Sequence, residues 1–337
     1  MTSLSNRQFR LAARPVGLPK PADWEYRTDQ TTAPAEGEVL VKNLYLSLDP
    51  AMRGWMNEGK SYIEPVRIGD VMRALGAGRV IESADPTLPV GTHVSGLLGV
   101  QEYATVKGKH MVPVDPALAP LPTYLGVLGM PGMTGYFGLL EVGQPKEGET
   151  VVVSGAAGAV GIVVGQVAKL KGCRVVGIAG GADKCRFVEE ELGFDSCVDY
   201  KAGNVKAQLR EHCPQGIDVY FDNVGGDILD DCLALLALHA RVIICGAISQ
   251  YNNTTPVKGP ANYLSLLVNR ARMQGIVVSD YTRQYGEAAR TMGSWLHAGK
   301  MKSKEDIVVG LETFPDTLLK LFRGENLGKL VLQVAEE

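Results

Sequence analysis

The sequence predicts an α/β protein that combines an antiparallel β unit with a doubly wound parallel sheet. Its 337 residues are enough for about two domains. Short alternating apolar runs dominate residues 1–123, and β-branched apolar runs alternate with helical patterns in residues 124–301. Residues 302–337 return to a short helical pattern and a strand-like end. We therefore expect three segments, of which the middle one forms the parallel sheet.

The antiparallel unit is predicted from short runs in which apolar and polar residues alternate. Such runs occupy residues 38–42, 78–82 and 92–96. The C-terminal segment adds a predicted helix over 314–322 and a predicted strand over 329–334.

The parallel sheet is predicted from six strand candidates that are separated by helical patterns. They occupy residues 150–154, 174–178, 196–199, 219–222, 241–245 and 275–278. Strands that alternate with helices form βαβ units, and six such strands fit a doubly wound sheet.

A glycine-rich turn, GAAGAVG at 155–161, connects the first of these strands to the helix that follows it. Glycines allow the backbone to approach a pyrophosphate, and the N–H groups at the start of a helix bind anions. Strand, glycine turn and helix in this order predict dinucleotide binding in a Rossmann domain. A glycine turn used only for close packing is the alternative.

The end of the second strand favours NADP over NAD. NAD-binding domains place an acidic residue there to hold the ribose 2′-hydroxyl, but residues 174–178 run into AGGA without an acid. Asp183 follows, at a position that suits the N-cap of the next helix. Lys184 comes next, and a lysine without an opposing acid suits a 2′-phosphate. A solvated lysine in the first helical turn is the alternative.

The composition argues against several other classes of protein. The formal charge of −3 and the lack of a basic block argue against nucleic acid as a partner. The sequence has no run of 18 apolar residues and no secretory signal pattern, so we expect a cytoplasmic protein that does not span a membrane. The six cysteines and five histidines have no zinc-ligand spacing, so we expect reduced, mostly buried thiols and no metal.

Seven motifs together resemble one protein family. They are SLDPAMRGWM (47–56), LGMPGMTGYFGLLEVG (128–143), GAAGAVG (155–161), AGGADK (179–184), VYFDNVGGDILD (219–230), CGAISQYN (245–252) and GENLGKLVL (324–332). In this order they resemble the zinc-independent medium-chain dehydrogenase/reductases. The most similar group is the NADPH-dependent alkenal/one oxidoreductases, which includes prostaglandin reductases (leukotriene hydroxydehydrogenases), plant double-bond reductases and bacterial curcumin reductase. The resemblance covers essentially the whole chain.

The resemblance implies how the domains are arranged. Residues 1–123 and 302–337 would form a GroES-like catalytic domain, and the Rossmann domain, 124–301, would be inserted into it. A cleft between the domains and a homodimer are also implied. Zinc-dependent relatives carry a Gly-His-Glu motif and a cysteine ligand in the first domain, whereas this chain has LGAG at 75–78 and its first cysteine at Cys173. These differences agree with the zinc-free branch.

The resemblance further implies which residues bind NADP(H). The residues that would contact the pyrophosphate are Gly158, Ala159, Val160 and Gly161. Those that would hold the 2′-phosphate are Lys184 and Tyr200, and Asn223 would lie near the adenosine ribose. Those that would lie on the nicotinamide side are Thr134, Cys245, Gly246, Ala247, Ile248 and Tyr251, and Asn326 would close over the cofactor. Each also has an ordinary interpretation: Tyr200 as a strand-end aromatic, Asn223 as a turn residue and Thr134 as a helix cap.

Tyr251 is the candidate catalytic residue. Hydride transfer to the β-carbon of an α,β-unsaturated carbonyl places negative charge on the carbonyl oxygen. A tyrosine O–H at that oxygen donates a hydrogen bond that strengthens as the enolate forms. A residue that binds ribose or forms part of the pocket wall is the alternative.

The substrate pocket is less well defined by the sequence. Many relatives have a tyrosine after the proline of the DPYMRG segment, and here Ala51 replaces it, which puts in doubt a preference for bulky aromatic substrates. The candidate pocket residues are Met52, Arg53 and Tyr263, with a structural role as the alternative for Arg53. Further candidates for the pocket wall, which are more often core residues, are Trp55, Met56 and Tyr62.

These features predict an NADPH-dependent reductase of the C=C bond of α,β-unsaturated aldehydes and ketones that uses no metal. An NADPH:quinone oxidoreductase is the alternative enzyme, because quinone reduction needs no proton donor beside an α-carbon. A non-catalytic NADPH-binding protein is a further alternative, against which Tyr251 beside an intact set of cofactor residues argues. Alcohol oxidation lacks a zinc ion or a Tyr-x-x-x-Lys pair to support an alkoxide.

Overall fold

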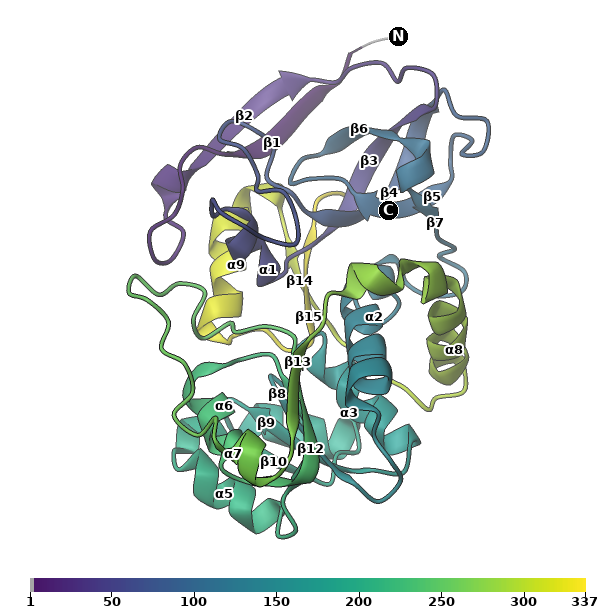
Figure 1. Cartoon of the computed structure of the whole chain (residues 1–337). Helices are drawn as coiled ribbons and strands as arrows, with labels where there is room; N and C mark the ends of the chain where they lie inside the picture. Colours follow the sequence, from purple (N-terminus) through teal and green to yellow (C-terminus); the bar gives the residue numbers. More distant parts are fainter. Residues whose placement is uncertain (1–2) are drawn as a thin grey trace. The chain divides into compact units, whose positions relative to one another are not determined.

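The computed structural model describes residues 3–337, and the chain folds into two compact units. Unit 1 contains the chain up to Leu125 together with Glu305–Glu337, and unit 2 contains Gly126–Lys304. Figure 1 shows the purple-to-blue N-terminal part and the yellow C-terminal part in the first unit, and the teal and green part in the second. The boundaries between the units lie after residues 125 and 304, whereas the sequence predicted domain boundaries after residues 123 and 301. No helix within 3–337 is long and apolar enough to cross a bilayer.

Unit 1 is built on a seven-stranded sheet. Its strands are β3 (Glu38–Ser47), β4 (Leu75–Ser83), β5 (His93–Leu97), β6 (Tyr103–Lys107), β7 (Val112–Pro113), β14 (Glu305–Val309) and β15 (Lys329–Gln333). The strand order is β14-β15-β3-β4-β5-β7, and β6 pairs with β3. All pairs are antiparallel, as predicted for this unit, except β14 with β15 at one edge, which is parallel. The helix α9 (Phe314–Arg323) connects these two strands, and a helical crossover is what a parallel pair requires.

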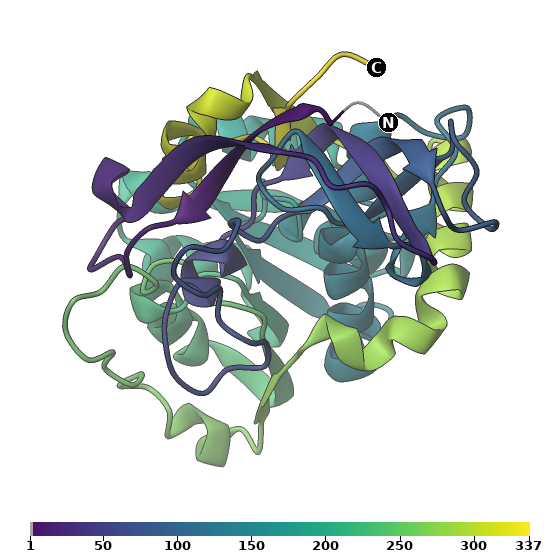
Figure 2. The same ribbon diagram turned by 90° about the horizontal axis from the view of Figure 1, so that it is seen from above.

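A separate antiparallel hairpin, β1 (Ser5–Leu11) and β2 (Trp24–Gln30), completes the unit and is the long purple ribbon in Figure 2. The Phe314 ring of α9 packs against Phe9 and Trp24 at centroid distances of 5.3 and 5.0 Å. The short helix α1 (Ala51–Trp55) enters the same core. The remaining short helices of unit 1 are η1 (Pro21–Asp23), η2 (Gly108–His110), η3 (Leu121–Leu125) and η8 (Leu311–Thr313).

Unit 2 contains a six-stranded sheet in which every pair is parallel. Its strands are β8 (Thr150–Ser154), β9 (Arg174–Ala179), β10 (Ser196–Asp199), β11 (Ile217–Asp222), β12 (Leu236–Ile244) and β13 (Arg272–Gly275). Their order is β10-β9-β8-β11-β12-β13. The first strand lies in the middle, and the chain moves outward to one side and then to the other, as in a Rossmann sheet. The prediction of a doubly wound sheet is confirmed.

Helices cover both faces of this sheet. On one face, α5 (Val205–His212) and α6 (Gly226–Leu233) pack on a core that includes Val152, Val176 and Tyr220. The other helices of unit 2 are α2 (Met130–Phe137), η4 (Gly138–Gly143), α3 (Gly161–Leu170), α4 (Ala182–Arg186), η5 (Phe187–Glu191), η6 (Tyr200–Ala202), α7 (Ser265–Val268), η7 (Val278–Gln284) and α8 (Tyr285–His297). Every residue of β8 is buried, which explains why this strand reads as a continuous apolar run.

Two local predictions in unit 2 are wrong. The last strand occupies Arg272–Gly275 rather than 275–278, because Ile276 is the last residue bonded to β12 and Val278 begins η7. Asp183 is not an N-cap: Gly181, with φ of 99°, is the N-cap of α4, and Asp183 lies in its first turn, paired with Arg186. The glycine supplies a left-handed conformation that aspartate would adopt at a cost.

Candidate functional site

The glycine-rich turn lies at the carboxyl end of β8 and leads into α3. Gly155 has a φ of 63°, in the region that favours glycine. A β-carbon on Gly161 would lie 2.2 Å from the Gly155 carbonyl oxygen, so only glycine fits there. A β-carbon on Gly158 would meet only that same oxygen, at 3.2 Å. Close packing thus explains Gly161, whereas Gly158 keeps open the space beside the helix start, where Ala159 and Val160 precede α3.

This turn fits a phosphate group. The first N–H groups of a helix have no partner within the helix and carry the positive end of its dipole. The N–H of Ile162 donates to the carbonyl of Gly158 at 3.0 Å, and those of Val163 and Val164 donate to the carbonyl of Val160 at 3.1 and 3.0 Å. Helical bonding therefore begins at Ile162, and the turn before it can offer backbone donors to an anion.

Asn223 follows β11, which neighbours β8 at the point where the strand order changes direction. Ligands bind at this switch point in doubly wound sheets. The side-chain amide of Asn223 donates to the carbonyl of Ser154 at 2.7 Å, and its backbone N–H donates to Ser154 Oγ at 2.9 Å. The Asn223 β-carbon also lies 3.5 Å from the position of a β-carbon on Gly155. Asn223 is therefore packed against the start of the glycine turn.

Asp222 organises this region, and the sequence analysis did not identify it. Its side chain is buried, and Oδ1 accepts hydrogen bonds from Ser154 Oγ at 3.0 Å and from the Tyr220 hydroxyl at 2.7 Å. The same oxygen accepts the N–H groups of Val224 and Gly225 at 3.0 and 2.9 Å. Burial raises the pKa of Tyr220 well above its usual value. A carboxylate that ends a buried strand at the switch point is the signal that could have revealed this role.

The segment 245–249 folds onto the turn after β11. The N–H groups of Cys245 and Gly246 donate to the Asp222 carbonyl at 2.9 and 3.1 Å, and that of Ile248 donates to the Asn223 carbonyl at 3.2 Å. The ends of β8, β11 and β12 are thereby joined at one edge of the sheet. The candidate nicotinamide segment is held by these backbone bonds and by the Ser249 hydroxyl, which donates to the Val224 carbonyl at 2.6 Å.

Tyr251 folds back over this segment. Its hydroxyl oxygen accepts the N–H of Ala247 at 3.1 Å, and a β-carbon on Gly246 would lie 2.7 Å from the same oxygen. A phenol has one proton and two lone pairs. In this bond the Tyr251 oxygen is the acceptor, so the bond holds the hydroxyl against the backbone of the segment 245–249.

Lys184 and Tyr200 follow the ends of two neighbouring strands, β9 and β10. Lys184 lies in α4, directly after the turn that follows β9. Tyr200 follows β10, and a β-carbon on Gly180 of that turn would lie 2.6 Å from the Tyr200 hydroxyl. Lys184 is partly exposed and Tyr200 is 38% exposed. The structure therefore places both side chains where a solvent-borne anion can reach them.

Thr134 lies in the middle of α2 rather than at a helix cap. Its hydroxyl donates to the Met130 carbonyl at 2.7 Å. The next residue, Gly135, packs closely on the helix that follows the glycine turn, because a β-carbon there would lie 3.1 Å from the Val160 carbonyl oxygen. Thr134 thus belongs to a helix that touches the candidate phosphate loop.

The remaining candidate residues have less distinctive surroundings. In unit 1, Met52 and Met56 are fully buried in the core, and Trp55 is buried beside them. The Arg53 guanidinium donates to the carbonyls of Pro15 and Gly17 at 3.0 and 3.1 Å, which favours its structural interpretation.

Three other candidates lie nearer the solvent. Asn326 donates to the Gly328 carbonyl at 2.9 Å in unit 1. Tyr62 in unit 1 and Tyr263 in unit 2 are exposed by 65% and 58%, so neither forms the wall of an enclosed pocket within its own unit.

All six cysteines are free thiols, five of them buried and Cys245 partly buried. Burial raises the pKa of Cys173 and Cys213 to about 11 and that of Cys245 to about 12. Among residues 3–337, no cluster of three or more His, Cys, Asp or Glu side chains is arranged to hold a metal ion.

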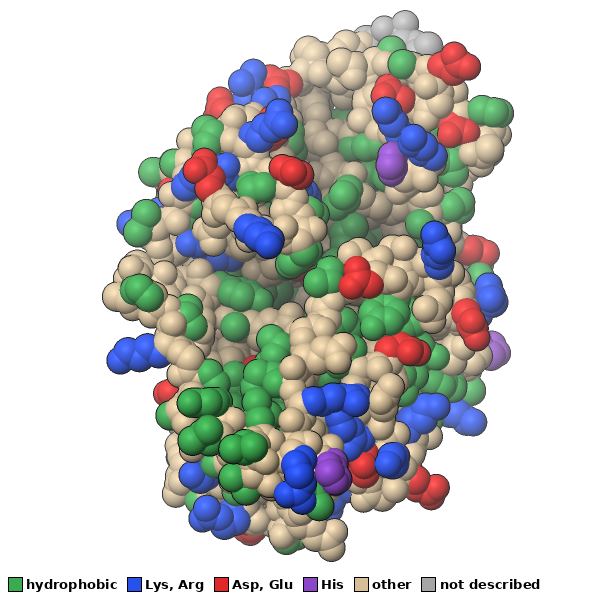
Figure 3. All heavy atoms as spheres, viewed as in Figure 1, with side chains coloured by type: hydrophobic (Ala, Val, Ile, Leu, Met, Phe, Trp, Pro, Cys, Tyr) green, Lys and Arg blue, Asp and Glu red, His purple; other side chains and the backbone are tan. Residues whose placement is uncertain are grey.

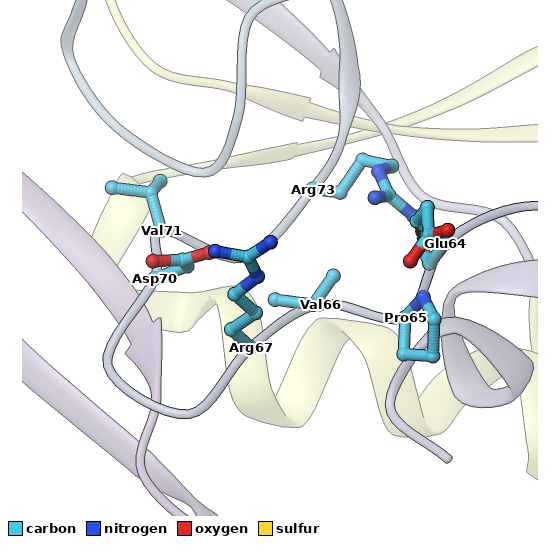
Figure 4. A pocket seen from close by; sticks show the side chains of 7 residues that line it. All are labelled: Glu64, Pro65, Val66, Arg67, Asp70, Val71 and Arg73. Carbon is cyan, nitrogen blue, oxygen red and sulfur yellow. Dashed lines mark hydrogen bonds between the residues drawn. The ribbon is translucent and has the colours of Figure 1, made fainter. Parts of the chain in front are cut away.

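A cavity of about 330 Å³ lies in unit 1 (Figure 4), next to Trp55: the Arg73 guanidinium lies 5.6 Å from the centre of the Trp55 ring, and the Val66 N–H donates to the Trp55 carbonyl at 2.8 Å. Its lining residues are Glu64, Pro65, Val66, Arg67, Asp70, Val71 and Arg73. Figure 4 shows Glu64 with Arg73 at one end and Asp70 with Arg67 at the other. Two acids and two bases give this lining no excess of positive charge, so it does not suit a dinucleotide pyrophosphate.

Comparison with known proteins gives matches over both units. Residues 7–114 match the model of an N-terminal domain of oxidoreductases, and residues 159–294 match that of a zinc-binding dehydrogenase. The chain is 46% identical to the NADPH-dependent curcumin reductase of Escherichia coli, over 98% of this chain and 97% of that protein. It is 42% identical to the NADP-dependent 2-alkenal reductase of Nicotiana tabacum, over 99% of both chains.

A solved structure agrees with these matches. CurA from Vibrio vulnificus in complex with NADPH superimposes with a TM-score of 0.93 at 45% identity, over 98% of this chain and 100% of that chain. Both the sequence and the fold are therefore shared over nearly the whole length. The chain belongs to the zinc-independent medium-chain dehydrogenase/reductase family, in the group of alkenal/one oxidoreductases.

Proposed function

We propose that this protein reduces the C=C bond of α,β-unsaturated aldehydes and ketones with NADPH. The observation that carries the proposal is the position of Tyr251 on the segment joined to the glycine turn through Asp222 and Asn223. The names of its relatives, among them a curcumin reductase and a 2-alkenal reductase, support the same reaction class.

The residues of unit 2 fit NADPH. The glycine turn and the start of α3 offer backbone donors to the pyrophosphate, and Gly158 leaves space for it. Lys184 supplies a positive charge and Tyr200 a hydroxyl for the 2′-phosphate, and no acid lies between Ala179 and Ala182 to repel it. When bound, NADPH supplies the hydride that reduces the substrate.

Tyr251 would stabilise the charge that develops on the substrate. Its hydroxyl oxygen accepts the Ala247 N–H, and the phenol would donate a hydrogen bond to the carbonyl oxygen as the enolate forms. A donor that is already oriented needs no reorganisation during the reaction, and the loss of one such donor costs about 10²- to 10³-fold in kcat. Thr134 and Asn326 would hold the cofactor rather than act on the substrate.

The test is an NADPH-oxidation screen over 2-alkenals such as 2-nonenal, enones, curcuminoids and 1,4-benzoquinone, with NADH as the control. We expect turnover of enals and enones with NADPH and much lower turnover with NADH. Turnover of quinones alone would replace the proposal with an NADPH:quinone oxidoreductase. Binding of NADPH without turnover of any acceptor would favour a non-catalytic role.

A Tyr251→Phe variant tests the catalytic assignment. We expect kcat with enones to fall by roughly 10²-fold or more, while binding of NADPH stays close to that of the wild type. The Tyr26→Phe variant is a matched control because Tyr26 is exposed by 44% and is not among the candidate site residues. Unchanged kcat/KM across several enones for Tyr251→Phe would remove this residue as the main donor.

We also propose that the protein forms a homodimer through the edge of its parallel sheet. Among the described strands, β13 pairs only with β12, which leaves its other edge open. Figure 3 shows a hydrophobic patch on the second unit, and four exposed apolar side chains lie on β12 and on the segment 264–268 that precedes β13. They are Leu238, Leu264, Leu267 and Val268. Light scattering should give twice the chain mass for the wild type and a lower mass for Leu267→Asp, whereas a monomeric wild type would contradict the proposal.

A further inference from the structure

We propose that Asp199 is a positioning residue that sets the preference of this enzyme for NADPH over NADH. The inference rests on the proposed function, in which Lys184 and Tyr200 hold the 2′-phosphate. Asp199 would act through these two residues rather than by touching the cofactor. Its acceptor oxygen would fix the distance between the turn that carries Lys184 and the turn that carries Tyr200.

The carboxylate of Asp199 joins the two turns that carry these residues. Asp199 is the last residue of β10, and its backbone pairs in register with Ala179 at the end of β9. Its Oδ1 accepts the N–H of Gly181 at 2.7 Å and the N–H of Lys201 at 2.9 Å. One oxygen atom therefore bonds both the turn before Lys184 and the turn that begins with Tyr200.

The two turns depend on this oxygen in different ways. Gly181 has a φ of 99° and is the N-cap of α4, so its position sets where the first turn of that helix begins. Lys184 lies in that turn. On the other side, Lys201 directly follows Tyr200, and the Tyr200 ring packs on Gly180. Removing the Asp199 carboxylate would therefore loosen both turns together, because the N–H of Gly181 and the N–H of Lys201 would lose the same acceptor atom.

The location of an acid here is unexpected for a phosphate site. A carboxylate beside a phosphate repels it, so electrostatics alone would favour a neutral residue. The two N–H donors explain the aspartate, because they require an acceptor at this position and partly offset its charge. Asparagine can present the same acceptor oxygen without the charge. Position and charge can therefore be separated by substitution.

The experiment compares four variants by their dissociation constants for NADPH and NADH, and by the binding of adenosine 2′-monophosphate measured by calorimetry. Asp199→Asn keeps the acceptor and removes the charge, and Asp199→Glu keeps the charge and displaces the acceptor. Asp199→Ala removes both. Asp183→Ala is the matched control. It removes a carboxylate from the neighbouring turn, and the side chain of Asp183 is 92% exposed.

We expect Asp199→Ala and Asp199→Glu to weaken binding of NADPH and of adenosine 2′-monophosphate by about tenfold or more. Binding of NADH should change by less than about twofold, because NADH has no 2′-phosphate. Asp199→Asn should bind NADPH at least as tightly as the wild type, and Asp183→Ala should keep the wild-type ratio. If Asp199→Ala does not fold, the comparison of Asp199→Asn with Asp199→Glu still decides the question.

Three results would overturn the inference. Equal loss of NADPH and NADH binding would show a general structural role, and an unchanged ratio in Asp199→Ala and Asp199→Glu would show no role. Weak NADPH binding by Asp199→Asn would show that charge, not acceptor position, matters. A wild-type protein that binds NADH as tightly as NADPH would instead contradict the proposed function itself. The two dissociation constants of the wild type are therefore measured before any variant is made.

Discussion

The glycine turn gives the sharpest prediction, because two of its glycines are required for different reasons. A methyl group on Gly161 would lie 2.2 Å from the Gly155 carbonyl oxygen and 2.8 Å from the α-carbon of Ala156, and both are backbone atoms. A methyl group on Gly158 would meet only the same carbonyl oxygen, at 3.2 Å, and otherwise points into open space. Gly161→Ala should therefore damage the protein, and Gly158→Ala should damage only its complex with NADPH.

The expected magnitudes follow from these contacts. Overpacking against backbone costs about 1–3 kcal/mol, which lowers the Tm of a unit of this size by roughly 2–12 °C. Alanine also restricts the unfolded chain, which offsets about 0.4–1 kcal/mol in both variants. This offset cancels when the two variants are compared with each other. For Gly158→Ala we expect a Tm close to that of the wild type and a Kd for NADPH that rises at least tenfold, or about 1.4 kcal/mol.

The assay combines scanning calorimetry of the cofactor-free protein with titration of the nucleotide fluorescence. Tight binding of NADPH by Gly158→Ala would refute the assignment of this turn to the pyrophosphate. An unchanged Tm for Gly161→Ala would refute the packing argument, since backbone atoms at 2.2 Å cannot be accommodated without movement.

Three further predictions concern buried or half-buried polar groups. Lys329 is buried, its Nζ lies 2.8 Å from Asp49 Oδ1, and burial lowers its pKa. Lys329→Met would leave the buried Asp49 carboxylate without this partner, so it should reduce the free energy of unfolding by about 3–5 kcal/mol. Urea titration measures this change. Burial tends to raise the pKa of Glu149, but hydrogen bonds from Arg241 and a backbone N–H outweigh it and lower that pKa. The unfolded state then binds more protons, so this stabilisation is complete above a pH of about 4.5 and is lost as the pH falls through the folded-state pKa. Glu149→Gln should flatten the acid limb of a plot of Tm against pH, and an unchanged limb would contradict this. Asp222→Ala should lower both the Tm and the affinity for NADPH, because it leaves four hydrogen-bond donors without their acceptor. Loss of affinity without loss of Tm would contradict this prediction.

Much of the parallel sheet could be predicted because its strands are buried on both faces. β8 and β10 occupy the predicted ranges, 150–154 and 196–199: β8 is a fully buried strand with three consecutive valines, and β10 buries its first three residues. The last strand was misplaced because β13 is an edge strand with exposed, polar residues. Its sequence, RMQG, lacks the apolar pattern on which the prediction depended.

The parts of the site that depend on loops joined across the sheet could not be predicted. Local patterns show that Asp222 and Asp199 end strands, but they do not show that Asp222 bonds Ser154, which is 68 residues away in the sequence. The assignment of Asp183 as an N-cap failed for a related reason. Aspartate is the commoner N-cap, and the sequence gives no measure of the φ of 99° that makes Gly181 necessary.

The acids at the strand ends of unit 2 share one physical role. Asp222 accepts the N–H groups of the turn after β11, and Asp199 accepts those of the turns after β9 and β10. A site for a polyanion would be expected to exclude carboxylates, yet each of these lies where backbone donors already surround it. Its charge is therefore balanced within the protein before any nucleotide approaches. The geometry of the nucleotide site then depends on acceptor oxygens at strand ends, while Lys184 and the helix dipole supply the attraction. Residues that shape such a site need not carry the charge that recognises the ligand.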